Sequence, residues 1–267
     1  VFEAAGAILA GGDVVNTIQK GIINPASMQN SEVFIWAMMS ALFAAALWVN
    51  IATWVGAPVS TTHAVVGGVM GAGIAAAGFS IVDWGTMSAI AASWVISPIM
   101  GGAIAAIFLA FIKYNVIYKD DKVSASRRWV PLLVAIMAGV FSAYLVTKGL
   151  KRIWRPDAVT VFAISLAFFA GTYAIVKPVI HRASVGMENR NKSVRALFTI
   201  PLICSAALLS FAHGANDVAN AVGPLAAIVE TSTSGAIDAK VGIPLWVMLI
   251  GAAGLSAGLF LFGPKLI

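Results

Sequence analysis

Long runs of apolar residues are the feature that most constrains how this chain can fold. Most of the runs reach the roughly 20 residues that a helix needs to cross a bilayer. They lie at residues 1–11, 33–52, 63–79, 86–112, 129–149, 158–178, 197–229 and 243–262. The sequence has no alternating strand pattern with regular turns, which disfavours an outer-membrane barrel. We therefore expect an all-α integral membrane protein, built as a polytopic helical bundle.

The charged residues support this class. They make up 10% of the chain, against about 25% in soluble domains. The net charge of +6 would suggest a nucleic-acid partner in a soluble protein, but here the basic residues gather between apolar runs, as membrane topology requires. The single cysteine, Cys204, lies inside an apolar run. It cannot form an internal disulfide, and the sequence holds no Cys/His cluster for a metal.

Lys and Arg also predict an orientation. Segments 113–128 and 177–195 carry five basic residues each, and segment 148–155 between them carries four. Two spans separate the first two segments, so they share a side, and their larger total places them in the cytoplasm. The sequence predicts a multi-pass protein of the inner or plasma membrane.

A weak internal repeat indicates two related halves. EAAGAILAGGDVV near the start resembles LSAGLFLFGPKLI at the end when Gly11 is aligned with Gly263. Membrane transporters are often built from inverted-topology repeats. We expect a first repeat with connecting membrane helices at 1–176, a cytoplasmic linker at 177–195 and a second repeat at 196–267. The chain begins and ends inside apolar patterns, so we expect a fragment with its first repeat truncated N-terminally and its second truncated C-terminally.

The segment SFAHGANDVANAVGP, residues 210–224, places polar residues within an apolar run. An Asp at the bilayer centre costs about 2.5–3.5 kcal/mol on insertion scales, so Asp217 should face a cavity or a partner. Ion or substrate coordination is favoured over a buried acid bonded to a neighbouring helix. In a helix, His213, Asn216 and Asn220 share one face and Asp217 lies beside it. The surrounding Gly and Ala permit close approach.

This segment has the chemistry of an ion site. Carboxylate and amide oxygens suit a small hard cation, and Asn amides can also donate to an anion. Pro224 disrupts the helical pattern. We therefore expect a broken or re-entrant element within 197–229, whose helix ends would present dipoles and carbonyls to ligands.

A second polar segment, GAPVSTTHAVVGG, spans residues 56–68. Its hydroxyls, at Ser60, Thr61 and Thr62, immediately precede an apolar helix. They fit an ordinary N-cap, or an anion site formed by hydroxyls and free backbone N–H groups. With Pro58 just before these hydroxyls, the run at 63–79 need not span the membrane.

The two segments together resemble the inorganic phosphate transporter (PiT) family. HGANDVANAVGP resembles its GANDVANA-type signature, PVSTTH resembles its second signature, and GGDVVNTIQKGI at 11–22 looks like the segment after an early membrane helix. The resemblance runs across the whole chain. It implies two inverted repeats, each with an Asn-Asp motif and a Ser-Thr-Thr motif, and phosphate bound near the midplane where the motifs meet.

The resemblance also implies site residues. The implied phosphate ligands are Ser60, Thr61, Thr62, Asn216 and Asp217. The implied cation site, with sodium placed at Asp217 and Asn220, is formed by Asp217, Asn220, Asn216 and Glu3. Glu3 matches an acidic position in the family's early helix and is implied to assist cation coupling, although a helix-packing acid is an equal alternative. With Gly11 aligned to Gly263, a first Asn-Asp motif and a second Ser-Thr-Thr motif fall outside the chain. We expect about half of a complete site here, and no transport by the fragment alone.

The sequence thus predicts a secondary active transporter that imports inorganic phosphate by cation symport, with sodium favoured. We expect no cofactor and no catalytic residues, and the phosphate-loop motif of ATPases is absent from the sequence. The expected partners are phosphate, sodium, membrane lipid and, at family level, a second copy in a homodimer. No nucleic acid is expected.

Alternative functions remain open at this stage. One is a proton-coupled phosphate permease, because a carboxylate can carry a proton. Another is a sulfate permease, although Asp217 would accept a hydrogen bond from protonated phosphate and repel sulfate. A remote third is an intramembrane hydrolase that pairs Ser60 or Ser210 with a histidine (His63 or His213) and Asp217, but no G-x-S-x-G elbow is present.

Overall fold

The structure is a computed structural model that describes residues 1–11, 21–24, 27–149, 154–237 and 243–266. Within these residues it is almost entirely helical and holds no strand beyond an isolated bridge between Ile23 and Val82. The α-helices are α1 (Phe2–Ala10), α3 (Ser31–Val55), α4 (Thr61–Ala77), α5 (Trp84–Ile112), α6 (Lys122–Tyr144), α7 (Ala158–Ala183), α8 (Asn191–Ser234) and α9 (Leu245–Leu266). Short turns of other helix types are η2 (Phe79–Ile81), η3 (Lys113–Ile117) and η4 (Leu145–Gly149). The predicted all-α fold is confirmed.

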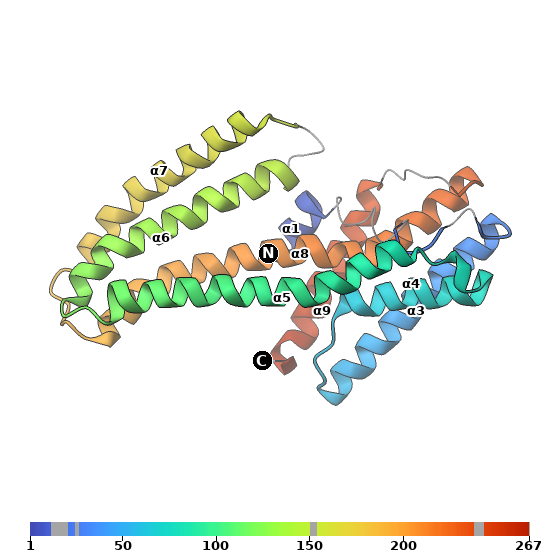
Figure 1. Cartoon of the computed structure of the whole chain (residues 1–267), viewed down its shortest axis with the longest axis horizontal. Helices are drawn as coiled ribbons and strands as arrows, with labels where there is room; N and C mark the ends of the chain where they lie inside the picture. Colours follow the sequence, from blue (N-terminus) through green and yellow to red (C-terminus); the bar gives the residue numbers. More distant parts are fainter. Residues whose placement is uncertain (12–20, 25–26, 150–153, 238–242, 267) are drawn as a thin grey trace. The chain divides into compact units, whose positions relative to one another are not determined.

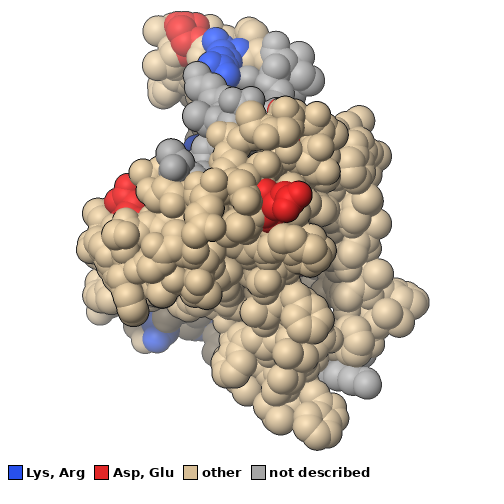
Figure 2. Space-filling model, turned by 90° about the vertical axis from the view of Figure 1, so that its right-hand side faces the viewer, with Lys and Arg blue, Asp and Glu red and all other residues tan. Residues whose placement is uncertain are grey.

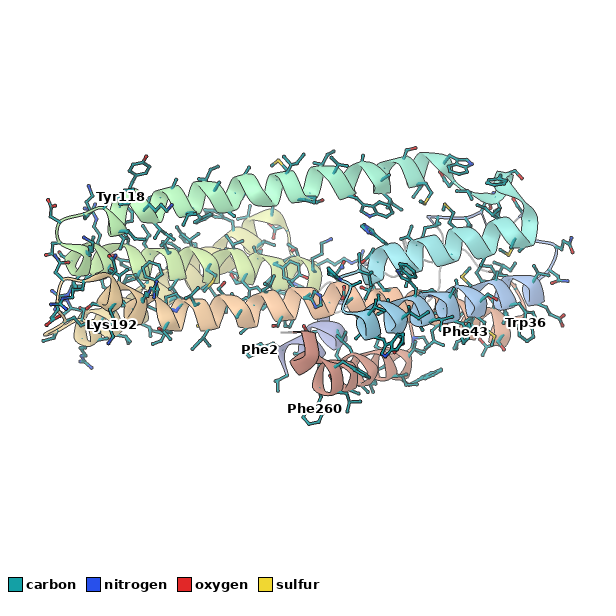
Figure 3. All side chains as sticks on the ribbon, turned by 90° about the horizontal axis from the view of Figure 1, so that it is seen from below. Phe2, Trp36, Phe43, Tyr118, Lys192 and Phe260 are labelled. Carbon is teal, nitrogen blue, oxygen red and sulfur yellow. The ribbon has the colours of Figure 1, made fainter. Side chains whose placement is uncertain are left out.

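Six helices in the described residues are long and apolar enough to cross a membrane. They lie at Ser31–Val55, Trp84–Ile117, Lys122–Gly149, Ala158–Ala183, Asn191–Ser234 and Leu245–Gly263. Large apolar side chains project outward from them, among them Trp36, Phe43 and Phe260 (Figure 3). The face seen in Figure 2 is largely uncharged, with only a few charged side chains on it. Such exteriors suit hydrocarbon rather than water, and the predicted polytopic membrane protein is confirmed.

The chain divides into two compact units, one formed by Val1–Ser93 with Ser210–Ile267 and the other by Trp94–Leu209. Helices α5 and α8 contribute to both. This division rests on contacts within the chain and does not test the repeats expected at 1–176 and 196–267. Those repeats stay a prediction.

In the first unit, α3 and α4 form a helical hairpin and lie side by side (Figure 1). Helix α3 begins where the Asn30 side chain accepts from the Val33 N–H at 2.9 Å. It ends at Gly56, whose left-handed conformation with φ 71° requires glycine. Gly68 of α4 then packs against the backbone of Ala41, where a Cβ would collide with the Ala41 carbonyl. The hairpin fixes where the first turn of α4 lies.

Helix α1 crosses α8 at two glycines in the same unit. Gly6 packs against the carbonyl of Phe211, and Gly214 packs against the backbone of Glu3, so that a Cβ at either position would collide with main-chain atoms. Helix α1 also packs along α9. Small residues permit this close approach, as in other membrane helix pairs.

Helix α8 corrects one expectation. It runs without interruption from Asn191 to Ser234, so the broken or re-entrant element expected within 197–229 is wrong. Pro224 is accommodated inside the helix. Its missing N–H removes one helical bond, the one to the carbonyl of Asn220, while the flanking turns remain helical. Buried neighbours such as Val222 and Ala226 hold these turns in the core of the first unit.

The apolar run at 63–79 forms the short helix α4. Helix α4 has 17 residues and falls short of the length of the six spanning helices. At 1.5 Å per residue it extends about 25 Å, less than the roughly 30 Å hydrocarbon thickness. The expectation that 63–79 need not span is consistent with this length.

In the second unit, α6 and α7 pack along each other (Figure 1). Their apolar core includes Val130, Val134, Ile180 and Leu197, the last from α8. At Gly139 the two helices approach so closely that a Cβ would lie 3.1 Å from the carbonyl oxygen of Ser165. The unit is thus held together by apolar packing along its length.

The loops of the second unit bear on the predicted topology. The backbone N–H of Lys122 donates to Asn189 Oδ1 at 2.8 Å, and the Asn189 amide donates to the carbonyl of Asp120. The segments before α6 and before α8 therefore lie at the same end of the unit, as predicted from the number of intervening spans. Their cytoplasmic side stays a prediction.

The linker expected at 177–195 stays a prediction, and it includes the end of α7 and the start of α8 as well as the loop between them. Helix α7 continues to Ala183 and α8 begins at Asn191, which leaves 184–190 between them. Hydropathy marks the border of the hydrocarbon, and a helix can continue past that border into polar sequence. The family-like segment at 11–22 lies largely in residues 12–20, outside the described residues.

Candidate functional site

The first turn of α4 supplies hydroxyl groups. Ser60 is the N-cap residue, and its Oγ accepts from the His63 N–H at 3.2 Å. Thr61 and Thr62 are the first two residues of the helix, so their hydroxyls lie where backbone N–H groups are without helical partners. The hairpin described above sets this turn against α8.

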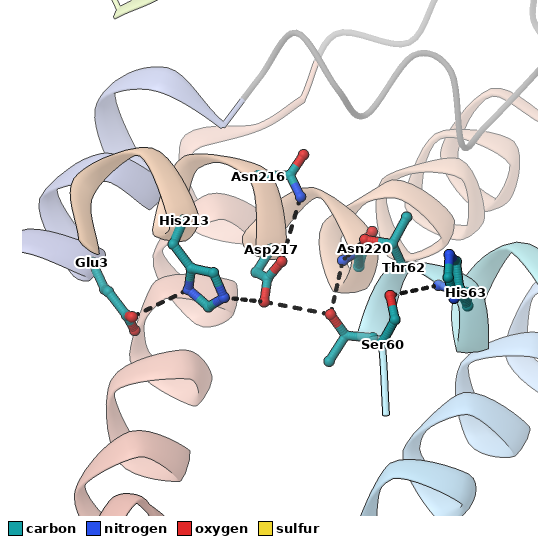
Figure 4. A network of polar contacts seen from close by, with 9 residues as sticks. Glu3, Ser60, Thr62, His63, His213, Asn216, Asp217 and Asn220 are labelled. Carbon is teal, nitrogen blue, oxygen red and sulfur yellow. Dashed lines mark hydrogen bonds and ion pairs between the residues drawn. The ribbon is translucent and has the colours of Figure 1, made fainter. Parts of the chain in front are cut away.

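Helix α8 presents one polar face to these threonines (Figure 4). The Asn220 amide donates to Thr61 Oγ1 at 3.2 Å and to Thr62 Oγ1 at 3.1 Å. The Thr61 hydroxyl in turn donates to Asp217 Oδ2 over a longer distance of 3.4 Å. Two motifs more than 150 residues apart thus form one hydrogen-bonded network.

The network extends to α1 through a histidine. His213 Nε2 lies 3.1 Å from Asp217 Oδ2, and His213 Nδ1 lies 3.1 Å from Glu3 Oε1 (Figure 4). The Glu3 and Asp217 side chains are each 15% exposed, whereas that of His213 is 53% exposed. The crossing of α1 and α8 at Gly214 explains the contact, because it places the backbone of Glu3 directly against α8.

Asn220 carries an unsatisfied oxygen. The residue is 3% exposed, and within the described part of the chain its Oδ1 is buried without a hydrogen-bond partner. Buried polar atoms are nearly always paired, and leaving one unpaired costs about 1–3 kcal/mol. A hard oxygen in this condition is suited to a cation or a ligand donor.

A cavity of about 430 Å³ adjoins the network. Its polar lining consists of Thr61, Asp217 and Asn220. The rest of its wall is apolar and comes from α3, α4, α8 and α9, including Leu42, Val222 and Leu255. Oxygen atoms therefore face a partly open pocket with mostly apolar walls, where electrostatic interactions are stronger than in bulk water.

The structure brings together most, but not all, of the predicted site residues. Thr61, Thr62, Asp217 and Asn220 meet, and Glu3 joins them through His213. Ser60 instead caps α4, which is the alternative role considered for it. Asn216 is exposed and donates to Asp217 Oδ1 at 3.4 Å. The contacting face is His213, Asp217 and Asn220, rather than the face through Asn216 expected from spacing.

His213 was missing from the predicted site residues. A histidine four residues before an aspartate on a helix is the pattern that brings their side chains together. That pattern gives the His213–Asp217 pair, but the second contact with Glu3 depends on how α1 crosses α8, which short-range spacing does not encode.

Taken together, the fold and this network define a multi-pass membrane protein whose helices α1, α4 and α8 share a hydrogen-bonded polar network rich in oxygen atoms. The chain belongs to the phosphate transporter family, whose model matches residues 1–267. Members of this family are transporters and not enzymes, so the hydrolase alternative is rejected, and the family indicates no cofactor. The protein is a multi-pass protein of the cell membrane.

Known proteins support the assignment. A protein named "Putative phosphate permease" from Helicobacter pylori strain J99 is 49% identical over 270 residues, which cover 100% of this chain and 51% of the relative. A protein of the same description from Pyrococcus abyssi is 32% identical over 98% of this chain and 64% of its own length. The chain thus spans about half the length of the Helicobacter relative.

A solved structure shares the fold. It is described as "The sodium-dependent phosphate transporter", has 33% sequence identity and aligns with a TM-score of 0.93 over 100% of this chain and 65% of its own. The described residues of the present chain hold no group of three or more His, Cys, Asp or Glu that could bind a metal ion.

Proposed function

We propose that the chain forms part of a secondary transporter that imports inorganic phosphate by symport with sodium. The observation that carries this proposal is the network in which Thr61 and Thr62 of one motif accept from Asn220 of the other, and Thr61 donates to Asp217. Thr61, Thr62, Asp217 and Asn220 are proposed as ligand-binding residues. Ser60 and Asn216 are proposed to reach phosphate only when the site rearranges around it.

Electrostatics support the need for a coupled cation. The network contains two carboxylates, Glu3 and Asp217, and among its described residues positive charge is limited to His213 when protonated. A phosphate anion entering beside Asp217 would be repelled unless a cation enters with it. The buried Oδ1 of Asn220 and the carboxylate of Asp217 are hard oxygens that suit sodium.

Proton coupling is the second candidate, and one observation favours it. Glu3, His213 and Asp217 form a continuous series of titratable groups with both contacts at 3.1 Å. Such a series could carry a proton between α1 and the threonines.

The similar solved structure is that of a transporter described as sodium-dependent, and we extend sodium to this chain by analogy.

Phosphate is proposed over sulfate on the basis of protonation. Near neutral pH phosphate carries a proton that it can donate to the Asp217 carboxylate, whereas sulfate carries none and would meet only repulsion. A site built to accept a hydrogen bond discriminates against a ligand that cannot donate one, because its acceptor is left unpaired.

The test is uptake of labelled phosphate by the complete transporter of which this chain is proposed to form part, reconstituted in liposomes. An inward sodium gradient and an inward proton gradient are imposed separately, with sulfate in excess as competitor. We expect sodium-driven uptake that resists sulfate and falls roughly 10- to 100-fold in Asp217→Asn, which removes one charged hydrogen-bonding group. Asp157→Asn is the matched control, because Asp157 is an exposed acid outside the network.

Each outcome has a distinct meaning. Uptake driven by protons alone would replace sodium with the second candidate and leave the site intact. Sulfate uptake without phosphate uptake would reject the substrate. Equal activity in Asp217→Asn and Asp157→Asn would reject the proposed site.

A further inference from the structure

A pocket lined by basic side chains lies in the second unit, at the loop ends of α6 and α7. It has a volume of about 510 Å³. Five basic side chains line it, two from α6 and three from the last turns of α7: Arg127, Arg128, Lys177, His181 and Arg182. The pocket belongs wholly to the second unit and has no residue in common with the transport network.

These charges are not neutralised by acids of the protein. Among the described residues, no ion pair joins any of the five basic side chains to a carboxylate. Arg127 instead donates through Nε to Ser184 Oγ at 2.6 Å and through Nη2 to the Ser184 carbonyl at 3.0 Å. These two bonds fix one edge of the guanidinium and leave its other N–H donors for a ligand.

Two more of the basic side chains lie over aromatic rings. The guanidinium carbon of Arg128 is 5.2 Å from the centre of the Trp129 ring, and Lys177 Nζ is 5.4 Å from the centre of the Tyr173 ring. Cation–π contacts of this length hold a charge in place without neutralising it. The pocket therefore presents several positioned, uncompensated cations.

The pocket lies where the spanning helices change from polar to apolar sequence. Val130 and Val134, in the next turns of α6, already belong to the apolar core of the unit, as does Ile180 of α7. Trp and Tyr are enriched at this level of a membrane, beside the lipid headgroups. Basic pockets between membrane helices at this level bind anionic headgroups.

We propose that this pocket binds the phosphate group of an anionic phospholipid headgroup. Topology alone requires only that basic residues be present at this end of the helices. It does not require charges from two helices to surround one cavity, with Arg127 held by Ser184 and two further cations held over rings. A headgroup phosphate would supply the acceptor oxygens that these donors lack.

The test measures lipid binding to the intact protein by native mass spectrometry, with phosphatidylglycerol or phosphatidylcholine added to the detergent-solubilised protein. The pocket variant is Arg128→Gln with Lys177→Gln. The matched control is Lys192→Gln with Arg195→Gln, which removes the same charge from exposed positions on α8 outside the pocket. Arg127 is left unchanged because it supports the loop through Ser184.

We expect phosphatidylglycerol to bind the unmodified protein in preference to phosphatidylcholine. The pocket variant should weaken that binding roughly 30-fold, from about 1 kcal/mol for each basic residue near the headgroups. The control variant should change it less than about threefold. Arg128→Lys with Lys177→Arg, which keeps both charges, should retain binding within about fivefold and guards against misfolding as the cause of a loss.

Other results would overturn the proposal. An equal loss in the pocket and control variants would mean diffuse attraction to a charged surface. Displacement of phosphatidylglycerol by millimolar inorganic phosphate, with the same dependence on Arg128 and Lys177, would make free phosphate the ligand. Equal binding of the two lipids would remove the anionic headgroup altogether.

Discussion

The two units of this protein use similar polar side chains in opposite surroundings. In the first unit, Asp217 and Asn220 lie on a helix whose neighbouring residues, such as Val218, are fully buried in an apolar core. In the second unit, polar contacts gather at helix ends. At the start of α7, for example, the Thr160 hydroxyl donates to the exposed Asp157 at 2.5 Å and lowers the pKa of that carboxyl.

This difference separates Asn220, which has a buried oxygen without a partner, from the exposed Asp157. Water can satisfy the remaining capacity of Asp157, so its contacts are complete without any bound molecule. The buried Oδ1 of Asn220 has no such access. Substitutions in the network of the first unit should therefore affect transport, whereas loop-end substitutions in the second unit should leave transport unchanged.

The largest effect should come from Gly214→Leu. A side chain here would collide with the backbone of Glu3, so α1 must move away from α8. We expect loss of phosphate uptake and a destabilisation of several kcal/mol, at or beyond the upper end of overpacking costs. Size-exclusion profiles and thermal melting in detergent would measure the stability. Gly171→Leu in α7 is the control, because a Cβ at Gly171 meets open space. Equal damage from both substitutions would show that the effect does not depend on the contact between α1 and α8.

Asn220→Leu should have the next largest effect. It removes both donors to the threonines and the unpaired Oδ1 while keeping a similar volume. We expect sodium-driven uptake to fall roughly 10- to 100-fold with little change in melting temperature, because removal of the unpaired buried Oδ1 offsets the loss of the two hydrogen bonds to the threonines. Asn115→Leu in the second unit removes a local bond to the Phe111 carbonyl and should leave uptake unchanged.

The two threonines should differ from each other by less. Thr61 contacts both Asp217 and Asn220, whereas Thr62 accepts from Asn220. Thr61→Val should therefore lower uptake more than Thr62→Val, by roughly three- to tenfold for one additional hydrogen bond. Uptake at a series of sodium concentrations would measure this. The opposite order would show that Thr62 is the more important phosphate contact and that the Asp217 contact is secondary.

The smallest effect on transport should come from Ser184→Ala. Ser184 is 1% exposed and accepts from Arg127, so its loss should cost about 1 kcal/mol. For a protein of this size the melting temperature should fall by roughly 2–4 °C, with uptake unchanged. A loss of uptake without a loss of stability would show that the second unit also contributes to transport.

Sequence alone predicted the fold class because apolar length is a local property. Every long helix coincides with an apolar run; the run predicted at 86–112, for example, lies within the helix that begins at Trp84. The exact ends of the helices could not be predicted as well from the sequence. Helix α7 extends through Lys177 and Arg182 because nothing in a basic sequence prevents a helix from continuing beyond the hydrocarbon. The uninterrupted α8 was missed because Pro224 removes only one helical bond, and packing on the neighbouring turns maintains the helix.

The sequence predicted the residues of the site better than it predicted the contacts between them. Asp217 and Asn220 were recognisable because polar residues inside an apolar run require a partner. The partners themselves depend on tertiary structure. The contact of Asn220 with Thr61 follows from the α3–α4 hairpin, and the contact of Glu3 with His213 follows from a helix crossing. Neither arrangement has a signal in local spacing.

The crossing of α1 and α8 has a mechanical consequence. Because Gly6 and Gly214 bring two main chains into direct contact, the helices cannot slide past each other without a steric clash. Their remaining freedom is rotation about the contact, which acts as a pivot. Glu3 and His213 lie next to that pivot, where rotation displaces atoms least. Their contact should survive movements that carry the far ends of both helices over much larger distances.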